Sequence, residues 1–174
     1  AGTGFAGSSG SPTTPQVGQT HSAADAPPAI SGGTLQVTPD GKTAVAADPD
    51  RDQVYIVDLA TRTLTHTVPL NHGDEPGRVA LDDAGQAHVA LRRGGAFVTI
   101  SLSTGTVVAR RDVCAAPRGL AYDGANQLVH VACADGQLVS FKASGGGPTR
   151  TLQLDADLRD VIVDKDVLHV SRFR

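Results

Sequence analysis

The feature that most constrains this chain is a segment that recurs about every 40 residues. The copy at 117–136, PRGLAYDGANQLVHVACADG, reads as a short strand, a turn rich in Asp, Gly and Asn, and a second strand. Near-copies begin at residue 77 (GRVALDDAGQAHVALRRGG) and at residue 158 (LRDVIVDKDVLHVSRFR), and a more diverged copy begins at residue 35 (LQVTPDGKTAVAADPDRD). A fixed period of this length indicates a repeat architecture, in which one small unit stacks on copies of itself.

Each unit alternates apolar and polar residues with a period of two, the pattern of half-buried β-strands joined by tight turns. The expected strands are 35–38, 43–47, 54–59 and 64–70, then 78–81, 87–91, 97–102 and 107–113, then 119–122, 128–133, 138–141 and 149–154, and finally 160–163 and 167–171. Four-stranded antiparallel meanders that return at a fixed interval are the blades of a β-propeller. We therefore predict an all-β fold, an incomplete β-propeller of about three and a half blades at 34–72, 77–113, 117–155 and 158–174.

Residues 1–31 have a different composition, dominated by Gly, Ser, Thr, Pro and Ala without an apolar period. Such a segment buries too little apolar surface to offset the entropy of ordering it, so we expect a disordered tether before the partial propeller at 32–174. A truncated fourth blade leaves two open strand edges, which invite pairing with other chains. We interpret the chain as the N-terminal part of a longer protein whose remaining blades close the ring, with closure by self-association as the alternative.

The overall charge and hydropathy exclude two classes of partner. The net charge of -3 and the pI near 6.0 provide no basic footprint for nucleic acid, and no apolar run approaches the length of a membrane span. No GxSxG, HExxH, P-loop or CxxCH motif is present, so we expect no catalytic residue, no metal and no cofactor. These observations favour a binding scaffold over an enzyme, with an unknown protein or a small anionic ligand as its partner.

Particular residues also resemble a known family. Pro39-Asp40-Gly41 forms the turn, Val54-Tyr55-Ile56-Val57-Asp58 the following strand, and Ala60-Thr61 the Thr-containing turn of the YVTN-type seven-bladed β-propeller repeat. The family's Tyr-Val-Thr position is occupied here by Ala44-Val45-Ala46, His88-Val89-Ala90, His130-Val131-Ala132 and His169-Val170-Ser171.

This resemblance, which covers everything after about residue 34, implies an exported bacterial protein of the periplasm or cell surface. It leaves two alternatives to a scaffold, because propellers host many unrelated activities. One is the propeller part of a redox protein with a di-haem cytochrome c peroxidase-like domain. The other is a lactonase-type hydrolase.

Cys114 and Cys133 are the only cysteines, and both fall in the third unit. Antiparallel pairing around a turn near Ala125 would place Cys133 close to Arg118, only a few residues from Cys114. The two thiols would then lie at the same end of one hairpin, so we predict a disulfide, with two free thiols or metal binding as alternatives. An oxidised pair would indicate an extracytoplasmic compartment.

Arg78, Arg118 and Arg159 recur at the start of the first strand in three units. First strands line the central channel of a propeller, so these side chains should point toward a common axis, where few carboxylates of the chain would reach them. Converging guanidinium groups suit an anion such as a carboxylate or phosphate. The alternative is structural, with each arginine bridging adjacent blades.

Histidine and aspartate recur as well. His88, His130 and His169 occupy one strand position, 42 and 39 residues apart, and lie in different blades, so we interpret them as packing residues between blades and not as ligands of one ion. Aspartates recur in the first hairpin turn of each unit, where we expect them to cap backbone N–H groups. They are Asp40, Asp82, Asp83, Asp123 and Asp164.

Overall fold

The computed structural model describes residues 33–173, and every regular element in that range is a β-strand. The expected tether at 1–31 lies outside the described residues. The first sheet contains β1 (Leu35–Val37), β2 (Thr43–Asp48), β3 (Gln53–Asp58) and β4 (Thr63–Pro69). The second contains β5 (Pro76–Leu81), β6 (Gln86–Leu91), β7 (Ala96–Ser101) and β8 (Thr106–Asp112). The third contains β9 (Pro117–Asp123), β10 (Leu128–Cys133), β11 (Gln137–Lys142) and β12 (Pro148–Gln153), and the fourth contains β13 (Leu158–Asp164) and β14 (Val167–Arg172).

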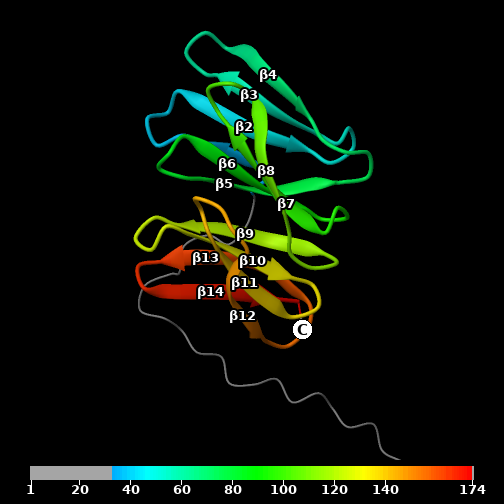
Figure 1. Ribbon diagram of the computed structural model, residues 1–174. Coiled ribbons are helices and arrows are strands. Elements are labelled where there is room, and N and C mark those ends of the chain that lie inside the picture. The colour runs from blue at the N-terminus through cyan, green and yellow to red at the C-terminus, as the bar shows by residue number, and fades with distance from the viewer. Residues whose placement is uncertain (1–32, 174) are drawn as a thin grey trace, which may run out of the picture.

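Each of the first three sheets is an antiparallel meander in which strands pair in chain order, and the fourth is a single hairpin. The sheets follow one another along the molecule (Figure 1). The first strands of successive sheets make contact: β1 with β5, β5 with β9, and β9 with β13. This is the arrangement of propeller blades around an axis. The predicted fold class is therefore confirmed, as an arc that does not close within residues 33–173.

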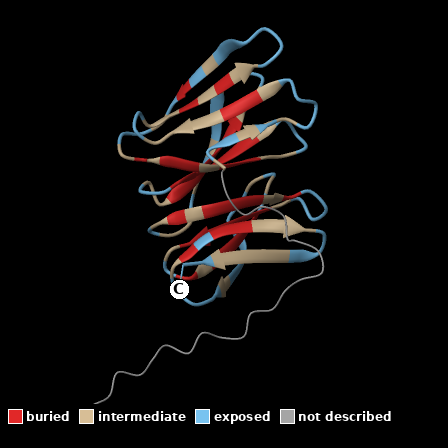
Figure 2. Cartoon of the chain, turned by 180° about the vertical axis from the view of Figure 1, so that it is seen from behind, coloured by how far each residue is buried: buried red, intermediate tan, exposed pale blue. Residues whose placement is uncertain are grey.

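The hydrophobic core lies between the faces of neighbouring blades (Figure 2). Val45 and Ile56 of the first blade pack with Val89 and Val98 of the second. The same stacking continues along the arc, and β6, β7 and β10 are buried over almost their whole length, because both faces of an inner blade meet other blades. No helix within residues 33–173 could span a bilayer.

Aromatic side chains add a second contact between the second and third blades. Phe97 and Phe141 meet edge to face with ring centroids 5.1 Å apart, and the guanidinium group of Arg111 lies 4.3 Å from the centroid of the Phe97 ring. Arg111 also donates a 2.6 Å hydrogen bond to the carbonyl of Lys142 in the next blade. This arginine therefore joins two blades, a role we had considered for the arginines at the strand starts.

A glycine controls how closely the last two blades approach. A Cβ atom added at Gly119 in β9 would lie 2.5 Å from the Cα atom of Asp160 in β13, far inside normal contact. Glycine at this position lets the two first strands lie against each other, which brings the start of β13 toward the start of β9.

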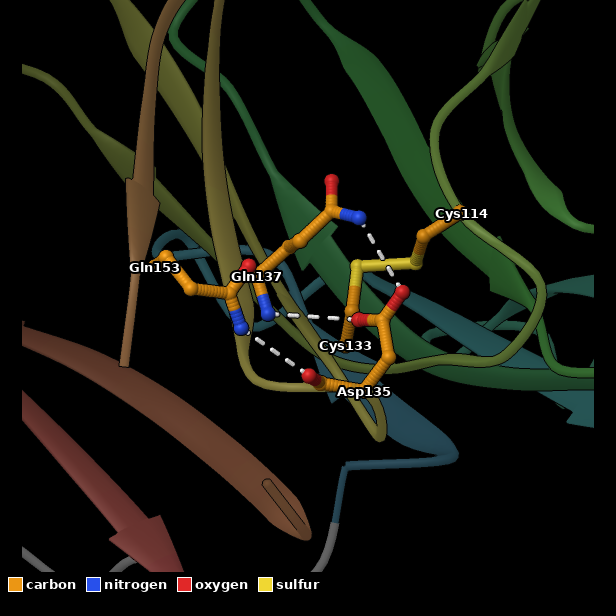
Figure 3. Close-up of a disulfide and its surroundings, with 5 residues drawn as sticks. All are labelled: Cys114, Cys133, Asp135, Gln137 and Gln153. Atoms are coloured by element: carbon orange, nitrogen blue, oxygen red, sulfur yellow. Dashed lines mark hydrogen bonds between the residues drawn. A yellow bond between two sulfur atoms is a disulfide. The ribbon is translucent and has the colours of Figure 1, made fainter. Parts of the chain in front are cut away.

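The predicted disulfide between Cys114 and Cys133 is confirmed (Figure 3), and the free-thiol and metal alternatives are wrong. The Cα atoms are 6.4 Å apart, because Cys133 lies opposite Pro117 in the β9–β10 ladder. Asp135 lies beside the bond, where its side chain accepts hydrogen bonds from the backbone and side-chain N–H groups of Gln137. The disulfide thus fixes the segment that leads into β9 and Arg118.

Candidate anion-binding site

The arginines at the starts of β5, β9 and β13 lie around one cavity of about 550 Å³. The charged residues that line it are Arg78, Arg92, Arg93, Arg118, Arg159 and Glu75. Arg78, Arg118 and Arg159 lie near the start of the first strand of their blades. The other two arginines come from the turn between β6 and β7. The arc thus brings together guanidinium groups that lie up to 81 residues apart in sequence.

Arg78 is partly buried and forms an ion pair with Asp160 at the start of β13. Asp160 is itself buried, and its other carboxylate oxygen accepts a 2.9 Å hydrogen bond from the backbone N–H of Val161. Burial lowers the pKa of the Arg78 guanidinium. Our expectation that carboxylates stay away from the arginines is therefore wrong for Arg78, because Asp160 lies inside a first strand and not in a distant turn.

The expectation is also wrong for Arg159, which lies 3.0 Å from a carboxylate oxygen of Asp157. Asp157 belongs to the turn just before β13, so the Arg159–Asp157 ion pair lies within one blade and does not connect two blades. The guanidinium carbon of Arg159 also lies 5.1 Å from the centroid of the Phe173 ring. Its side chain is 42% exposed, which leaves N–H groups facing the cavity available to a ligand.

Arg118 differs from both. It is half-buried and lines the cavity, and its side chain makes no hydrogen bond or ion pair with any residue in the described range 33–173. A guanidinium group has five N–H donors and no acceptor, so its direct partner must be an acceptor from outside residues 33–173. Arg118 is the clearest position in this cavity for a bound anion.

Arg92 and Arg93 share one acid. Their guanidinium nitrogens lie 3.8 Å and 3.2 Å from the two carboxylate oxygens of Glu75. Five arginines thus line the cavity, while three carboxylates (Glu75, Asp157 and Asp160) contact them. The difference leaves an excess of two positive charges around this space, in a chain whose net charge is negative.

Sequence reasoning missed Arg92 and Arg93, although a signal was present. The second unit reads ALRRGG where the third reads ACADG, so two arginines stand where the third unit has Ala134 and Asp135. This departure from the repeat gives the second blade a turn that contributes positive charge to the cavity.

The histidines are not part of this site. Nδ1 of His88 lies 3.0 Å from Oγ1 of Thr99, and its Nε2 lies 3.2 Å from a carboxylate oxygen of Asp82. Burial lowers the pKa of His88 to about 4, with Asp82 opposing the shift. The imidazole is therefore neutral at physiological pH and forms a buried polar network inside its own blade.

The third blade repeats this network in a weaker form. Nδ1 of His130 lies 2.8 Å from Oγ of Ser140, while its Nε2 lies 3.7 Å from a carboxylate oxygen of Asp123. In the fourth blade His169 lies 4.0 Å from Asp164. The histidines do occupy separate blades, and packing between blades is confirmed for His88, whose ring centroid lies 6.2 Å from that of Tyr122 in the next blade. The interpretation omitted a second set of partners, the turn aspartates of their own blades.

The predicted capping of hairpin turns is confirmed for Asp40, Asp82 and Asp123, whereas Asp83 instead accepts a hydrogen bond from the Tyr122 hydroxyl. Asp82 accepts hydrogen bonds from the backbone N–H groups of Ala84 and Gln86, and Asp40 accepts one from the backbone N–H of Lys42. Asp82 therefore serves two functions at once, with one oxygen on the turn and the other on His88. An Asp–His–hydroxyl set also occurs in hydrolases, but here the hydroxyls of Thr99 and Ser140 are buried between strands.

Comparison with known proteins supports the architecture. No protein-family model matches the chain, and no curated protein matches its sequence. The structure is similar to Kuenenia stuttgartiensis hydrazine synthase, with a TM-score of 0.70 and 18% identity over 86% of this chain and 43% of that one. It is also similar to the WD40 repeats of RRP9, with a TM-score of 0.68 and 14% identity over 79% of this chain and 44% of that one.

A third similar structure is a chain of a mitotic checkpoint complex, with a TM-score of 0.71 and 15% identity over 79% of this chain and 43% of that one. At these identities the likeness shows the fold alone, which is that of a β-propeller. The chain spans less than half the length of the solved chains it matches. The likeness to the YVTN-type repeat rests only on the sequence motifs described above.

Proposed function

We propose that this chain is a non-catalytic propeller scaffold that binds an anionic ligand, or an acidic group of a partner protein, at the arginine-lined cavity. The observation that carries the proposal is Arg118, a half-buried guanidinium group without a partner among residues 33–173, at a cavity lined by five arginines. A scaffold role agrees with the propeller fold of the similar structures, since propellers present rigid surfaces built from many blades.

The chemistry of the cavity favours a carboxylate or a phosphate. The planar guanidinium fork of Arg118 can donate two parallel hydrogen bonds to two oxygens of one such group. Arg159, Arg92 and Arg93 are exposed enough to add further donors or long-range attraction. Arg78 takes a supporting role, because its pair with Asp160 holds β5 and β13 together beneath the ligand.

We further propose that the scaffold acts outside the cytoplasm and belongs to a larger propeller. The disulfide between Cys114 and Cys133 supports an oxidising compartment, where such bonds form and persist. The similar solved chains are more than twice as long as the part this chain matches, which supports further blades beside these.

The test is calorimetric titration with succinate, a small dicarboxylate, and with inorganic phosphate as a second probe. We expect saturable binding that weakens as sodium chloride rises from about 50 to 300 mM, because screening reduces attraction at a solvent-facing site. Arg118→Ala should weaken binding at least about tenfold, and Arg118→Lys should give an intermediate value because the charge stays but the fork is lost.

Arg150→Ala is the matched control. Arg150 lies exposed on the outer strand β12, away from the cavity, and it carries the same charge. Its replacement changes net charge as Arg118→Ala does, so its dissociation constant should stay at the wild-type value. Equal weakening in both variants would mean that the probes respond to overall charge, and no binding by the wild type would overturn the proposed function.

A further inference from the structure

The first strands of three blades contain a β-bulge at the same place. In β5, Gly77 and Arg78 stand where β6 has Ala90 alone. In β9 and β13 the extra residues, which the ladders skip, are Arg118 and Arg159. A bulge leaves one residue out of the ladder and can re-aim its side chain. Because the extra residues line the arginine-lined cavity, the bulges direct the starts of these strands toward it.

The cross-strand register identifies the equivalent residues of the three blades. The residues opposite the recurring histidines are Ala80, Ala121 and Ile162. Three positions before them stand Gly77, Arg118 and Arg159, which are therefore equivalent. Arg78 stands one residue further along β5, at the position that Asp160 occupies in β13. Its role in the cavity therefore differs from that of Arg118 and Arg159.

The second blade supplies its guanidinium group from a turn. Gly77 has no side chain, and a Cβ atom added there would lie 3.2 Å from Cγ and Cδ of Arg92. The Arg92 side chain therefore passes over Gly77, and Arg92 lines the cavity. Each of three successive blades thus contributes one guanidinium group at the bulge.

An acid of the same blade contacts two of these three groups. Asp157 stands two residues before Arg159, and a carboxylate oxygen of Asp157 lies 3.0 Å from the Arg159 guanidinium. Glu75 stands at the equivalent position of the second blade, and its carboxylate lies 3.8 Å from the Arg92 guanidinium. The segment that enters the first strand can therefore hold a carboxylate beside the guanidinium group of its blade.

The third blade departs from this arrangement. The equivalent position is Ala116, which lines the cavity and carries no carboxylate. Arg118 is the extra residue of its strand, as Arg159 is, yet its side chain has no partner within residues 33–173. The methyl group of Ala116 thus explains why Arg118 keeps its hydrogen-bonding capacity while the guanidinium groups on either side do not.

From this exception we infer that Ala116 is the specificity-determining residue of the cavity, and that the ligand supplies one carboxylate to Arg118 as Asp157 does to Arg159. The inference rests on the proposed function and narrows its ligand to a group with a single carboxylate. Every other guanidinium group that lines the cavity already contacts a carboxylate of the chain. A second carboxylate on the ligand would therefore add little.

The first experiment is calorimetric titration of the full chain with succinate and with monomethyl succinate, which has one carboxylate. We expect their dissociation constants to agree within about fivefold, because one carboxylate makes the contact with Arg118. A larger preference for succinate would overturn the single-carboxylate ligand. N-acetyl-aspartate N-methylamide presents the same group as a protein side chain. Tighter binding than monomethyl succinate assigns the carboxylate to a partner protein, and equal or weaker binding assigns it to a small acid.

Ala116→Glu and Ala116→Gln are a matched pair, similar in size and different in charge. The glutamate should weaken binding of monomethyl succinate at least about tenfold, since its own carboxylate would pair with Arg118 in place of the ligand. The glutamine should leave the dissociation constant within about threefold of the wild type, because it adds bulk without the charge. Equal weakening by both substitutions would show a steric effect and overturn the role of Ala116.

The converse variant is Asp157→Asn. Asparagine tolerates the left-handed backbone of this position, where φ is 70°, and it removes only the charge. The arginine Nε–H signals in nuclear magnetic resonance spectra report each guanidinium group separately. Monomethyl succinate should shift the Arg118 signal alone in the wild type and the signals of both Arg118 and Arg159 in the variant. An Arg159 signal that stays unmoved in the variant would contradict the inference.

The outcomes separate this inference from the proposed function. If succinate binds the wild type and Ala116→Glu equally tightly, the inference is overturned while the anion site stands. The same holds if phosphate binds and no carboxylate probe does. If neither succinate, phosphate nor monomethyl succinate binds the wild type, both proposals fail together.

Discussion

Two sets of polar residues recur along this chain, and the structure gives them opposite surroundings. The histidines at the second strands are buried and bonded within their blades: His88 has a partner at each ring nitrogen. The arginines at the first strands face a shared cavity, and Arg118 has no partner within residues 33–173. Recurrence at a fixed spacing is the same in both sets, so recurrence alone does not distinguish a structural residue from a binding residue.

What separates the two sets is whether hydrogen-bonding capacity is satisfied inside the protein. A buried polar group whose hydrogen-bond partners are in place stabilises the fold. When one partner is removed, the other stays buried without a hydrogen bond, which lowers the stability of the protein. A cationic group at a solvent-facing cavity without a partner contributes little to folding and keeps its capacity for a ligand. The two sets should therefore respond differently to the same mutation.

The largest expected effect is on His88. His88→Ala should lower the free energy of unfolding by about 4 kcal/mol, because it leaves a cavity at a fully buried site and removes the partner of Asp82 and Thr99. His130→Ala should cost less, about 2 to 3 kcal/mol, since Nε2 of His130 has no hydrogen-bond partner to lose. Urea denaturation of both variants measures the difference, and equal costs would contradict the ranking.

Lowering the pH should test the hydrogen-bond network of His88 without a mutation. The pKa of His88 is about 4 in the folded protein and about 6.5 in the unfolded chain, so only the unfolded chain takes up a proton between these values. Stability should be complete above about pH 6.5 and should fall by about 3 kcal/mol as pH drops to 4, with His130 adding a loss of the same sign. The measurement is the free energy of unfolding against pH.

His88→Gln should remove the His88 part of that fall and leave only the part due to His130. His72→Gln is the matched control for removing a histidine, since the His72 side chain is fully exposed. A wild-type profile that is already flat between pH 6.5 and 4 would show that His88 is not held neutral by the fold.

A similar loss should follow reduction of the disulfide. The bond closes a loop between positions 19 residues apart, and removing that constraint costs about 3 kcal/mol in the chain-entropy model. Because the bond holds the segment leading to Arg118, reduction should also weaken succinate binding, while oxidised protein in the same buffer serves as control. Unchanged stability and binding after reduction would mean that β9 needs no covalent support.

The repeat predicted the blades well because strand alternation and turn residues are local signals. All fourteen strands lie where the pattern of apolar residues places them, and the Cys114–Cys133 bond followed from the register of one hairpin. The environment of the arginines could not be read in this way. It depends on Gly119, which lets β13 approach β9 and so brings Asp160 to Arg78, a contact between blades that no local pattern encodes.

The same limit applies to the histidines. His88 and Asp82 were each singled out from the sequence, but their pairing requires the exact twist of one hairpin.

The most direct test of this contrast measures stability and succinate binding in the same variant, Arg118→Ala. If Arg118 is a binding residue, the dissociation constant should rise at least about tenfold, while the free energy of unfolding stays within about 0.5 kcal/mol of the wild type. A loss of about 2 kcal/mol or more in stability, with an unchanged dissociation constant, would show that Arg118 supports the fold as the histidines do and that the cavity is not a binding site.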